Sequence, residues 1–409
     1  MVGDGRVDGE RLQSGLTDRR GLEQETATQV AYKPQSGASS VGTLVPVNMR
    51  DAIQASLERV NNEVGDVDKY VADALGFKQS EIGDYFSAEQ VDALALAVYN
   101  AEKDRGFIIG DQTGIGKGRV VAGMIRYALN KGKIPIFVTE KPNLYADMIR
   151  DLDDIGMSVP LALESGKPAI LITNGGESIP YQLLRKADGE VVESNFTLKA
   201  PKSGKALDEM LTGMMEEGSL GPYKVVFTTY NQLQTVKGRA TARMNFVRQF
   251  GDGGYMIFDE SHNAGGTVLT QPRTKAEKAA VKAGESTVGR AGFVRSLVAK
   301  SAGSFFSSAT YAKRPDVMDL YSSTNMLLAV NKPADLGPAI KEGGVPMQQI
   351  VATMLTEDGQ YIRRERTFAG VGYETREMVV DKRTAENMGL SLLCQAWVAT
   401  CTTERPGAA

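Results

Sequence analysis

The sequence predicts an α/β protein built on a mostly parallel, doubly wound sheet. Short, continuously apolar runs recur along the chain, and segments with helical periodicity separate them. A strand that is apolar at every position is buried on both faces, as happens when helices cover both sides of a parallel sheet. A glycine-rich turn also joins one of these strands directly to a helix, an arrangement typical of nucleotide-binding domains.

Six apolar runs supply the predicted strands. The helices between them return the chain so that each strand can start parallel to the last. This strand-then-helix rhythm predicts a RecA-like domain. The runs are GFIIG (106–110), IPIFVT (134–139), PAILIT (168–173), KVVFTT (224–229), YMIFD (255–259) and SFFSSA (304–309).

Composition is that of a globular protein and excludes several kinds of site. The 409 residues are 42% hydrophobic and 24% charged, with a formal net charge of −3, so a nucleic-acid contact would need a local basic patch. The two cysteines, Cys394 and Cys401, have no metal-ligand partners near them, which excludes a zinc ribbon and a disulfide scaffold. The single histidine, His262, excludes a His-rich metal site.

Nothing in the sequence indicates a membrane or secretion. No apolar run approaches the roughly 20 residues that span a bilayer. The N-terminus carries acidic residues and no apolar core, unlike a signal peptide. We therefore expect a cytoplasmic protein with no membrane partner.

The chain divides into four predicted parts. Residues 1–40 are rich in Gly, Ser, Gln and charge, which indicates a flexible segment. Residues 41–105 carry apolar residues at helical spacing and predict a helical extension. Residues 106–330 hold the RecA-like lobe, with a hairpin insertion at about 174–204 around an Asp-Gly turn. Residues 331–409 predict a linker and the start of an incomplete second lobe.

A phosphate-binding loop is predicted in GFIIGDQTGIGKGRVVAGMI, residues 106–125. A buried strand leads into a glycine-rich turn and then a helix, and this context distinguishes a phosphate loop from a chance match. Lys117 would reach the β- and γ-phosphates, while backbone amides and the positive end of the helix face the same charge. The alternative is an ordinary glycine-rich turn. The predicted nucleotide-binding residues of the loop are Thr113, Gly114, Ile115, Gly116, Lys117, Gly118 and Arg119.

Two positions depart from the usual pattern of such loops. Asp111 stands where glycine or another small residue is usual. Gly118 stands where a Ser or Thr hydroxyl normally holds Mg²⁺. A metal ion would then depend more on the acidic motif, on water or on Thr113.

A pair of carboxylates at the end of another strand completes the predicted catalytic site. Asp259 and Glu260 end the strand in YMIFDESHNAG, residues 255–265. Asp259 would bind Mg²⁺, and Glu260 would orient and deprotonate the water that attacks ATP. Alone, such a strand end is often a solvated terminus, but its order after the phosphate loop favours catalysis. Glu260, Asp259 and Lys117 are therefore the predicted catalytic residues, with ATP and Mg²⁺ as their ligands.

A coupling motif is predicted at the end of the next strand. SFFSSATYAKRP, residues 304–315, places Ser308 and Thr310 there. With His262, which would sense the γ-phosphate, they would link the state of the nucleotide to domain closure. The alternative is a polar strand end without function.

Gln90 is the predicted adenine-contacting residue. Its amide can both donate to and accept from the base, and Tyr85 and Phe86 could stack on the base. The alternative is a helix-surface residue in a capping box with Ser87.

Nucleic acid is predicted to contact the segments that follow two of the strands. Lys141 and Asn143 follow one strand, and Thr229, Tyr230 and Asn231 end or follow another. These contacts would go to backbone phosphates and be independent of base sequence, as a translocating motor requires. A basic stripe could add contacts through counterion release, although a charge run is usually a solvated helix face. Its residues are Arg273, Lys275, Lys278, Lys282, Arg290, Arg295 and Lys300.

Six segments together resemble the strawberry notch-like family of DExH-type superfamily 2 helicases. The resemblance covers about residues 32–380 and includes the GKGR ending of the phosphate loop, so Gly118 is a family trait. It implies that Lys117, Asp259 and Glu260 carry ATPase chemistry. The segments are VGTLVPVNM, FSAEQVDALALA, GFIIGDQTGIGKGRVVAGMIRYA, FVTEKPNLYADMIRDLDDIG, FDESHNAG and SSATYAKRP.

The resemblance also implies partners. Bacterial and phage members of the family often sit in large DNA-processing or antirestriction polypeptides beside adenine-methyltransferase domains, so DNA is the expected nucleic acid. The run GQYIRRERTFAGVGYETREMVV is similar to the family's passage into a second RecA-like lobe, whose arginines complete the ATP site. The chain stops in CQAWVATCTTERPGAA without a helix end or polar tail, so we expect the natural protein to continue.

Two functions of different classes stay open at this point. The first is an ATP-dependent DNA helicase or translocase lobe, which the Asp259–Glu260 pair favours. The second is a scaffold module that holds ATP and DNA without turnover, which the incomplete second lobe favours. A metabolic kinase would need an acceptor-substrate motif, and the sequence shows none.

Overall fold

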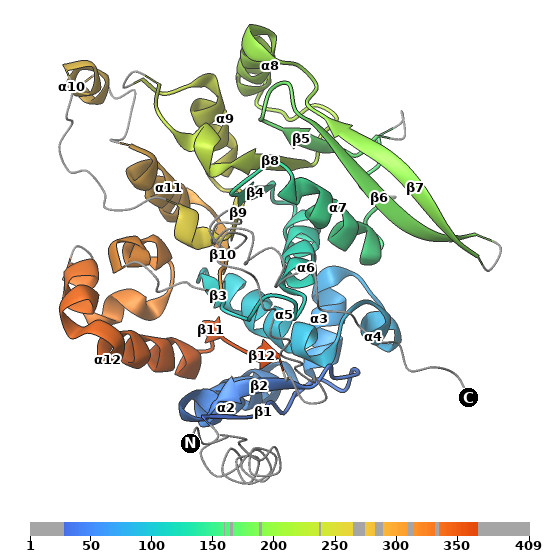
Figure 1. Cartoon of the computed structure of the whole chain (residues 1–409), viewed down its shortest axis with the longest axis vertical. Coiled ribbons are helices and arrows are strands. Elements are labelled where there is room, and N and C mark those ends of the chain that lie inside the picture. The colour runs from blue at the N-terminus through green and yellow to red at the C-terminus, as the bar shows by residue number, and fades with distance from the viewer. Residues whose placement is uncertain are drawn as a thin grey trace, which may run out of the picture. The chain divides into compact units, whose positions relative to one another are not determined.

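The computed structural model describes residues 28–366, apart from 159, 164–166, 188–189, 237–238, 265–274, 283–288, 310–314 and 332–334. A seven-stranded sheet lies at the centre of this part of the chain, in the order β11-β3-β10-β9-β4-β8-β5 (Figure 1). Every pairing within it is parallel. The strands are β3 (Phe107–Ile109), β4 (Pro135–Thr139), β5 (Ile170–Ile172), β8 (Val225–Thr229), β9 (Tyr255–Asp259), β10 (Gly303–Ser307) and β11 (Tyr361–Ile362).

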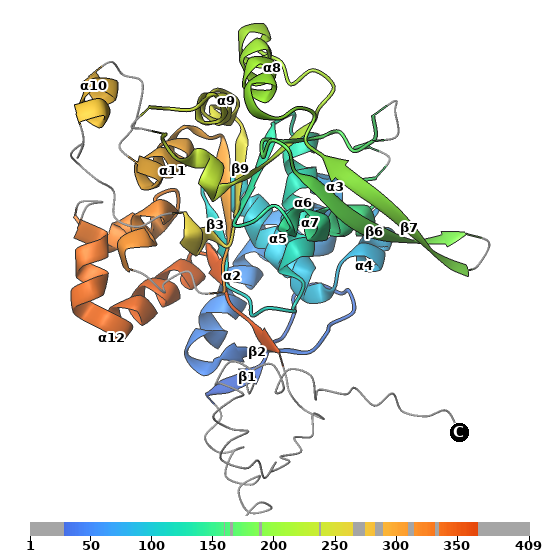
Figure 2. The ribbon, with the colours of Figure 1, turned by 45° about the horizontal axis from the view of Figure 1, so that its top comes forward.

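The predicted doubly wound arrangement is confirmed, and all six predicted strands form. Strands β3, β4, β5 and β8 are buried at every position, as their continuous apolar runs require. Figures 1 and 2 show α5, α6 and α7 on one face of the sheet and α9 and α11 on the other. These helices are α5 (Ala88–Ala101), α6 (Lys117–Asn130), α7 (Leu144–Asp154), α9 (Ala242–Gly251) and α11 (Gly289–Lys300).

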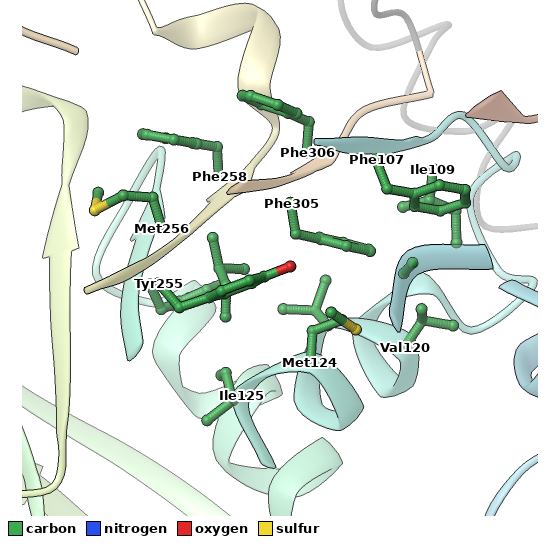
Figure 3. Packing of buried hydrophobic residues seen from close by; sticks show 14 of the residues in the cluster. Phe107, Ile109, Val120, Met124, Ile125, Tyr255, Met256, Phe258, Phe305 and Phe306 are labelled. Carbon is green, nitrogen blue, oxygen red and sulfur yellow. The ribbon is translucent and has the colours of Figure 1, made fainter. Parts of the chain in front are cut away.

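Alternating side chains of the middle strands build the core on both faces of the sheet (Figure 3). Phe305 of β10 lies beside Phe107 of β3, with ring centroids 5.9 Å apart, on the face that packs against α6. Phe306 points to the opposite face and stacks on Phe258 of β9, with centroids 5.5 Å apart. Because successive side chains of a strand point to opposite faces, this packing holds the middle strands on both sides. It therefore fixes the residues at their carboxyl ends.

The helical extension is confirmed, but regular secondary structure begins at Gln29, earlier than the predicted start of the extension at residue 41. Strand β1 (Gln29–Ala31) pairs antiparallel with β2 (Thr43–Pro46). The buried carboxylate of Asp92 accepts hydrogen bonds from the backbone N–H groups of Gln35 (3.0 Å) and Ser36 (2.9 Å). These bonds hold residues 28–40, which the sequence assigns to a flexible segment. The extension continues with α2 (Val47–Val64), α3 (Val67–Leu75), η1 (Gln79–Glu81) and α4 (Ile82–Tyr85).

The predicted insertion is an antiparallel hairpin of β6 (Ser178–Ala187) and β7 (Glu190–Lys199). The two residues of its predicted turn, 188–189, lie outside the described residues. Tyr181 stacks on Phe196 with ring centroids 5.4 Å apart. Ile149 and Leu152 of α7 lie against the same aromatic pair and line a small cavity of about 60 Å³ with it. The hairpin is thus anchored to the lobe through α7.

The chain after residue 330 differs from the predicted linker. Helix α12 (Leu336–Glu357) packs against α2, and strand β11 joins the central sheet beside β3. Strand β12 (Glu365–Arg366) then pairs with β2. Residues up to Arg366 therefore belong to the same compact unit as the lobe, whereas the sequence analysis ends the lobe at 330. The remaining elements are α8 (Gly204–Glu217), η2 (Tyr230–Leu233), η3 (Ser261–Asn263), α10 (Lys275–Lys282), η4 (Pro315–Tyr321) and η5 (Asn325–Ala329).

None of the helices in the described part of the chain combines the length and the apolar character needed to cross a lipid bilayer.

Candidate nucleotide-binding site

The glycine-rich loop lies between the end of β3 and the start of α6. Gly114 (φ 92°) and Gly116 (φ 93°) adopt the left-handed region that favours glycine. Among the described residues, no side chain caps the first turn of α6, where the Arg119 N–H donates to the Gly116 oxygen (3.1 Å), so the N–H groups of Lys117 and Gly118 are available to an anion. Thr113 and Gly114 are exposed at the tip, whereas the Ile115 side chain is buried and leaves only its backbone to contact a ligand.

Lys117 folds back over this loop. Its Nζ donates a hydrogen bond to the backbone oxygen of Asp111 (2.6 Å). Burial lowers the pKa of Lys117, and the negative charges of Asp111, Glu260 and Asp259 oppose that shift. Lys117 therefore lies within the electrostatic reach of both carboxylates of the acidic motif.

The acidic motif lies at the same edge of the sheet as the loop. Strand β10 separates β3 from β9, and Ser307 is in register with Ile109 on one side and Asp259 on the other. The Asp259 carboxylate accepts a hydrogen bond from Thr139 Oγ1 at the end of β4 (2.9 Å). Burial raises the pKa of Asp259, while the hydrogen bonds from Thr139 and Ser307 act to lower it.

Glu260 has an unusual backbone conformation for a residue with a Cβ. Its φ of 46° lies in the left-handed region, a strained conformation that persists only where the surrounding structure imposes it. The side chain is half-buried. Burial raises the pKa of Glu260, the nearby Lys117 lowers it, and the negative charge of Glu140 raises it further. The result is a carboxyl group that takes up a proton more readily than an ordinary glutamate.

His262 connects the acidic motif to β10. Its Nδ1 lies 2.9 Å from Ser308 Oγ and 3.3 Å from Glu260 Oε2. Two of the three predicted coupling residues, His262 and Ser308, thus meet beside the acidic pair. The third, Thr310, lies outside the described residues. Their coupling role stays a prediction.

Gln90 supports the phosphate loop directly. Its side-chain oxygen accepts a hydrogen bond from the Ser87 backbone N–H (3.0 Å), as part of the capping box that begins α5. Its amide nitrogen donates to the backbone oxygen of Gly116 (3.3 Å). The structure therefore contains the capping box that the sequence offers as the alternative role of Gln90. A contact with adenine stays a prediction and would require this amide to share or exchange its partners.

Comparison with known protein families matches residues 69–388 to the family described as P-loop containing NTP hydrolase pore-1. The chain belongs to this family. The match includes both the glycine-rich loop and the acidic motif, the two parts of the site that meet at the sheet edge. In a P-loop NTP hydrolase these are the expected positions of the nucleotide phosphates and of the groups that act on them.

The chain is also similar to known strawberry notch proteins, which confirms the resemblance found in the sequence. It is 27% identical over 318 residues to protein strawberry notch homolog 1 of Homo sapiens, covering 73% of this chain and 19% of that protein. Protein strawberry notch of Drosophila melanogaster is 25% identical over 289 residues, covering 68% and 14%. The chain thus spans about a fifth or less of the length of these relatives. Among solved structures, the Sulfolobus solfataricus SWI2/SNF2 ATPase core domain matches with a TM-score of 0.37 and 14% identity, covering 68% of this chain and 42% of that chain.

The position of Asp151 on α7 favours glycine at position 118. A Cβ added to Gly118 would lie 2.1 Å from Asp151 Oδ2. Burial raises the pKa of Asp151 to about 6. Arg119, also predicted to bind nucleotide, is ion-paired with Asp154 and donates to the backbone oxygen of Tyr85 (3.2 Å).

Replacing Gly118 by alanine is expected to lower the free energy of unfolding by about 1 kcal/mol, because the new methyl group overpacks the contact with Asp151. Gly213→Ala in α8 is the matched control, since nothing lies within 4 Å of a Cβ there. That substitution is expected to raise stability by about 0.5–1 kcal/mol, the usual gain from replacing a helical glycine. Urea unfolding measures both. Equal stabilisation by the two substitutions would show that Asp151 moves aside freely.

Two of the predicted nucleic-acid contacts need correction. Thr229 and Tyr230 are 1% and 2% exposed. The Thr229 hydroxyl accepts a hydrogen bond from Asn174 Nδ2 (3.0 Å), and the Tyr230 hydroxyl donates to the backbone oxygen of Asp259 (2.8 Å). Both side chains are therefore buried beneath the sheet edge that carries the acidic motif, and they present no surface to a nucleic acid.

The other three predicted contacts are exposed. Lys141 and Asn143 follow β4, and Asn231 follows β8, the neighbouring strand in the sheet. Arg290 of the basic stripe joins them, with its guanidinium 3.4 Å from Asn231 Oδ1. Arg295 does not join them, because it is largely buried and ion-paired with Asp319. Arg273 lies outside the described residues.

The sequence does not reveal the buried ion pair between Asp111 of the loop and Arg364. The Arg364 side chain is fully buried, and its Nη2 lies 2.6 Å from Asp111 Oδ2. Its backbone N–H also donates to Asp111 Oδ1 (2.8 Å). Burial by itself lowers the pKa of Arg364, but Asp111 together with Tyr32 and Asp92 raises it above its ordinary value. Asp111 thus replaces the usual small residue in order to anchor a segment 253 residues away in the chain.

Proposed function

We propose that the chain binds ATP with Mg²⁺ and hydrolyses it as one lobe of a motor that moves along nucleic acid, with DNA as the expected track. The observation that carries the proposal is the position of Lys117 within the electrostatic field of Asp259 and Glu260 at one edge of the sheet. A lysine on a phosphate loop and a carboxylate pair are the groups that P-loop hydrolases use for phosphoryl transfer to water. Membership of the NTP hydrolase family supports the same chemistry.

Asp259 is the residue that would hold Mg²⁺. Its donor chemistry fits, because Mg²⁺ in nucleotide sites is held by one or two carboxylates together with phosphate oxygens. The ion would neutralise charge on the phosphates when bound. Thr139 Oγ1 orients the Asp259 carboxylate, and the Tyr230 hydroxyl fixes the backbone of the same residue. Both bonds restrict how far this carboxylate can move.

Glu260 is the proposed base for the attacking water. Burial raises the pKa of Glu260 toward the working pH, which improves a general base as long as the group still ionises. Lys117 nearby favours that ionised form. His262 lies within reach of Glu260 and of Ser308, so a change at the nucleotide can alter the end of β10 through this histidine.

The proposed nucleic-acid path crosses the carboxyl ends of β4 and β8. These strands are neighbours, with Thr139 in register with Thr229. Exposed Lys141, Asn143 and Asn231 follow them directly. Polar and cationic side chains of this kind contact the sugar-phosphate backbone and carry no base specificity, which suits a motor that must pass along any sequence.

Phosphate release from Mg·ATP, measured with and without DNA, tests the proposal. DNA is expected to increase release, and Lys117→Ala is expected to reduce it by about 100-fold or more, as loss of a charge-stabilising donor does in other active sites. Lys103→Ala is the matched control, because Lys103 is an exposed lysine of the helical extension paired with Glu63. ATP binding that depends on Lys117 but yields no phosphate would favour the scaffold function. No ATP binding at all would contradict both functions.

A further inference from the structure

The segment that follows β11 runs beside the phosphate loop at a fixed register. The backbone N–H of Gly110 donates to the oxygen of Ile362 (2.8 Å), and that of Gln112 donates to the oxygen of Arg364 (2.8 Å). The N–H of Arg366 then donates to the side-chain oxygen of Gln112 (2.9 Å). Residues 110–112, which lead into the loop, are therefore hydrogen-bonded to residues 362–366 at every second position.

Two further contacts fix this segment. The buried ion pair of Arg364 with Asp111 holds its middle, and the pairing of β12 with β2 holds its end, with Arg366 in register with Thr43. A buried pair with several hydrogen bonds leaves little freedom to either partner. Arg366 therefore has a defined position at the loop.

The Arg366 side chain reaches the glycine turn itself. A Cβ added to Gly114 would lie 2.8 Å from Arg366 Cζ and 3.0 Å from Nε and Nη1. The guanidinium thus lies in contact with Gly114, three residues before Lys117. Its planar face can approach the turn this closely because Gly114 has no side chain.

The charge on Arg366 has no acidic partner among the described residues. The other arginines of the same segment are both neutralised: Arg364 pairs with Asp111, and Arg363 pairs with Glu365 at 2.8 Å. Arg366 is exposed, and its guanidinium makes no hydrogen bond to another residue of the described ranges. A guanidinium that lacks an acidic partner in the described part of the chain and is held against an anion-binding turn is a ready partner for phosphate oxygens.

We propose that Arg366 is a second cation of the nucleotide site, which contacts the terminal phosphates of a bound nucleotide together with Lys117. This inference rests on the proposed function, because it assigns a further ligand to the same phosphate loop. Guanidinium groups bind phosphate through two parallel hydrogen bonds, which a lysine cannot do. The position of Arg366 on β12 also means that the end of the described lobe is in direct contact with the loop that holds the nucleotide.

Equilibrium titration of the whole chain with ATP and with ADP, in the presence of Mg²⁺, tests this role. Arg366→Ala is expected to weaken ATP binding by about tenfold, as removal of a charge-assisted hydrogen bond does, and Arg366→Lys is expected to restore part of that loss. Arg363→Ala is the matched control, since it removes an exposed arginine of the same segment whose charge is already paired. Its nucleotide affinity is expected to equal that of the unaltered chain.

The outcomes separate this inference from the proposed function. ATP binding that depends on Lys117 but is unchanged within twofold in Arg366→Ala would overturn the role of Arg366 and leave the proposed function intact. Tighter binding by Arg366→Ala would also overturn it, because the arginine would then compete with the phosphates. No binding of ATP by the unaltered chain would overturn both.

Discussion

Replacement of Arg364 by methionine is expected to lower the free energy of unfolding by about 3–5 kcal/mol, the usual cost of leaving one partner of a buried ion pair without the other. The Asp111 carboxylate would stay in a position where its side chain is 2% exposed, and it would lose the guanidinium that neutralises it. The backbone oxygen of Glu89, which accepts a hydrogen bond from Arg364, would lose a donor as well. Urea unfolding followed by circular dichroism measures this loss.

Arg363→Met is the control for this prediction. It replaces the neighbouring arginine, whose side chain is 46% exposed, and is expected to change stability by less than about 0.5 kcal/mol. The double variant Asp111→Leu with Arg364→Met removes both buried charges and is expected to be more stable than Arg364→Met alone. If Arg364→Met lowered the free energy of unfolding by less than about 1 kcal/mol, this would contradict a buried ion pair whose two partners depend on each other.

Glu260→Gln is expected to reduce phosphate release by about 10²- to 10⁴-fold, the contribution that a positioned general base makes. ATP affinity is expected to stay within a few fold, because glutamine keeps the shape of the side chain and Lys117 still faces the loop. Turnover and equilibrium nucleotide binding, measured on the same preparations, distinguish a chemical defect from a binding defect. Loss of binding in parallel with turnover would contradict the role of a base.

Glu140→Gln is a matched control, and it is also expected to shift the pH dependence of turnover. The negative charge of Glu140 raises the pKa of Glu260, so its removal lowers that pKa. Glu260 acts as a base only when ionised, and turnover is therefore lost as the pH falls through its pKa. Glu140→Gln is expected to retain turnover and to move the pH at which turnover is lost on acidification toward lower values. An unchanged pH of this loss would show that a group other than Glu260 controls it.

The strands and the two central motifs of the site are predictable because their signals are local. Apolar runs such as the one that ends at Asp259 identify buried strands directly. The carboxyl ends of parallel strands lie at one edge of the sheet, so the loop at Gly114–Gly116 and the acidic pair are predicted to share that edge once the strands are known. The register of β10 with both neighbours shows this edge in the structure.

The ion pair at Asp111 is not predictable in the same way. Its partner lies 253 residues later, after a strand of only two residues, Tyr361–Ile362, which is too short to show a periodicity. The sequence marks Asp111 only as a departure from the usual loop, without indicating what it binds. The extent of the lobe is underestimated for the same reason, because β11 and β12 have no pattern of their own.

The error at Thr229 and Tyr230 has a different cause. Their place after a strand at the catalytic edge is predicted correctly, but the direction of a side chain there depends on the turn that follows. The 3₁₀ helix η2 begins at Tyr230, and the tyrosine ring is buried so that its hydroxyl meets Asp259. Sequence order identifies the edge of the sheet, but it does not determine which side chains point outward.

The central claim is that Lys117 and Asp259 act on one magnesium nucleotide, and a double-mutant cycle on Mg·ATP affinity tests it most directly. Lys117→Ala, Asp259→Asn and the double variant would be titrated with ATP in Mg²⁺ and again in EDTA. We predict that the double variant loses clearly less affinity than the sum of the two single losses, with a coupling of at least about 0.5 kcal/mol, and that the effect of Asp259→Asn disappears in EDTA. Additive losses, or an Asp259→Asn effect that does not depend on the metal, would contradict a shared site.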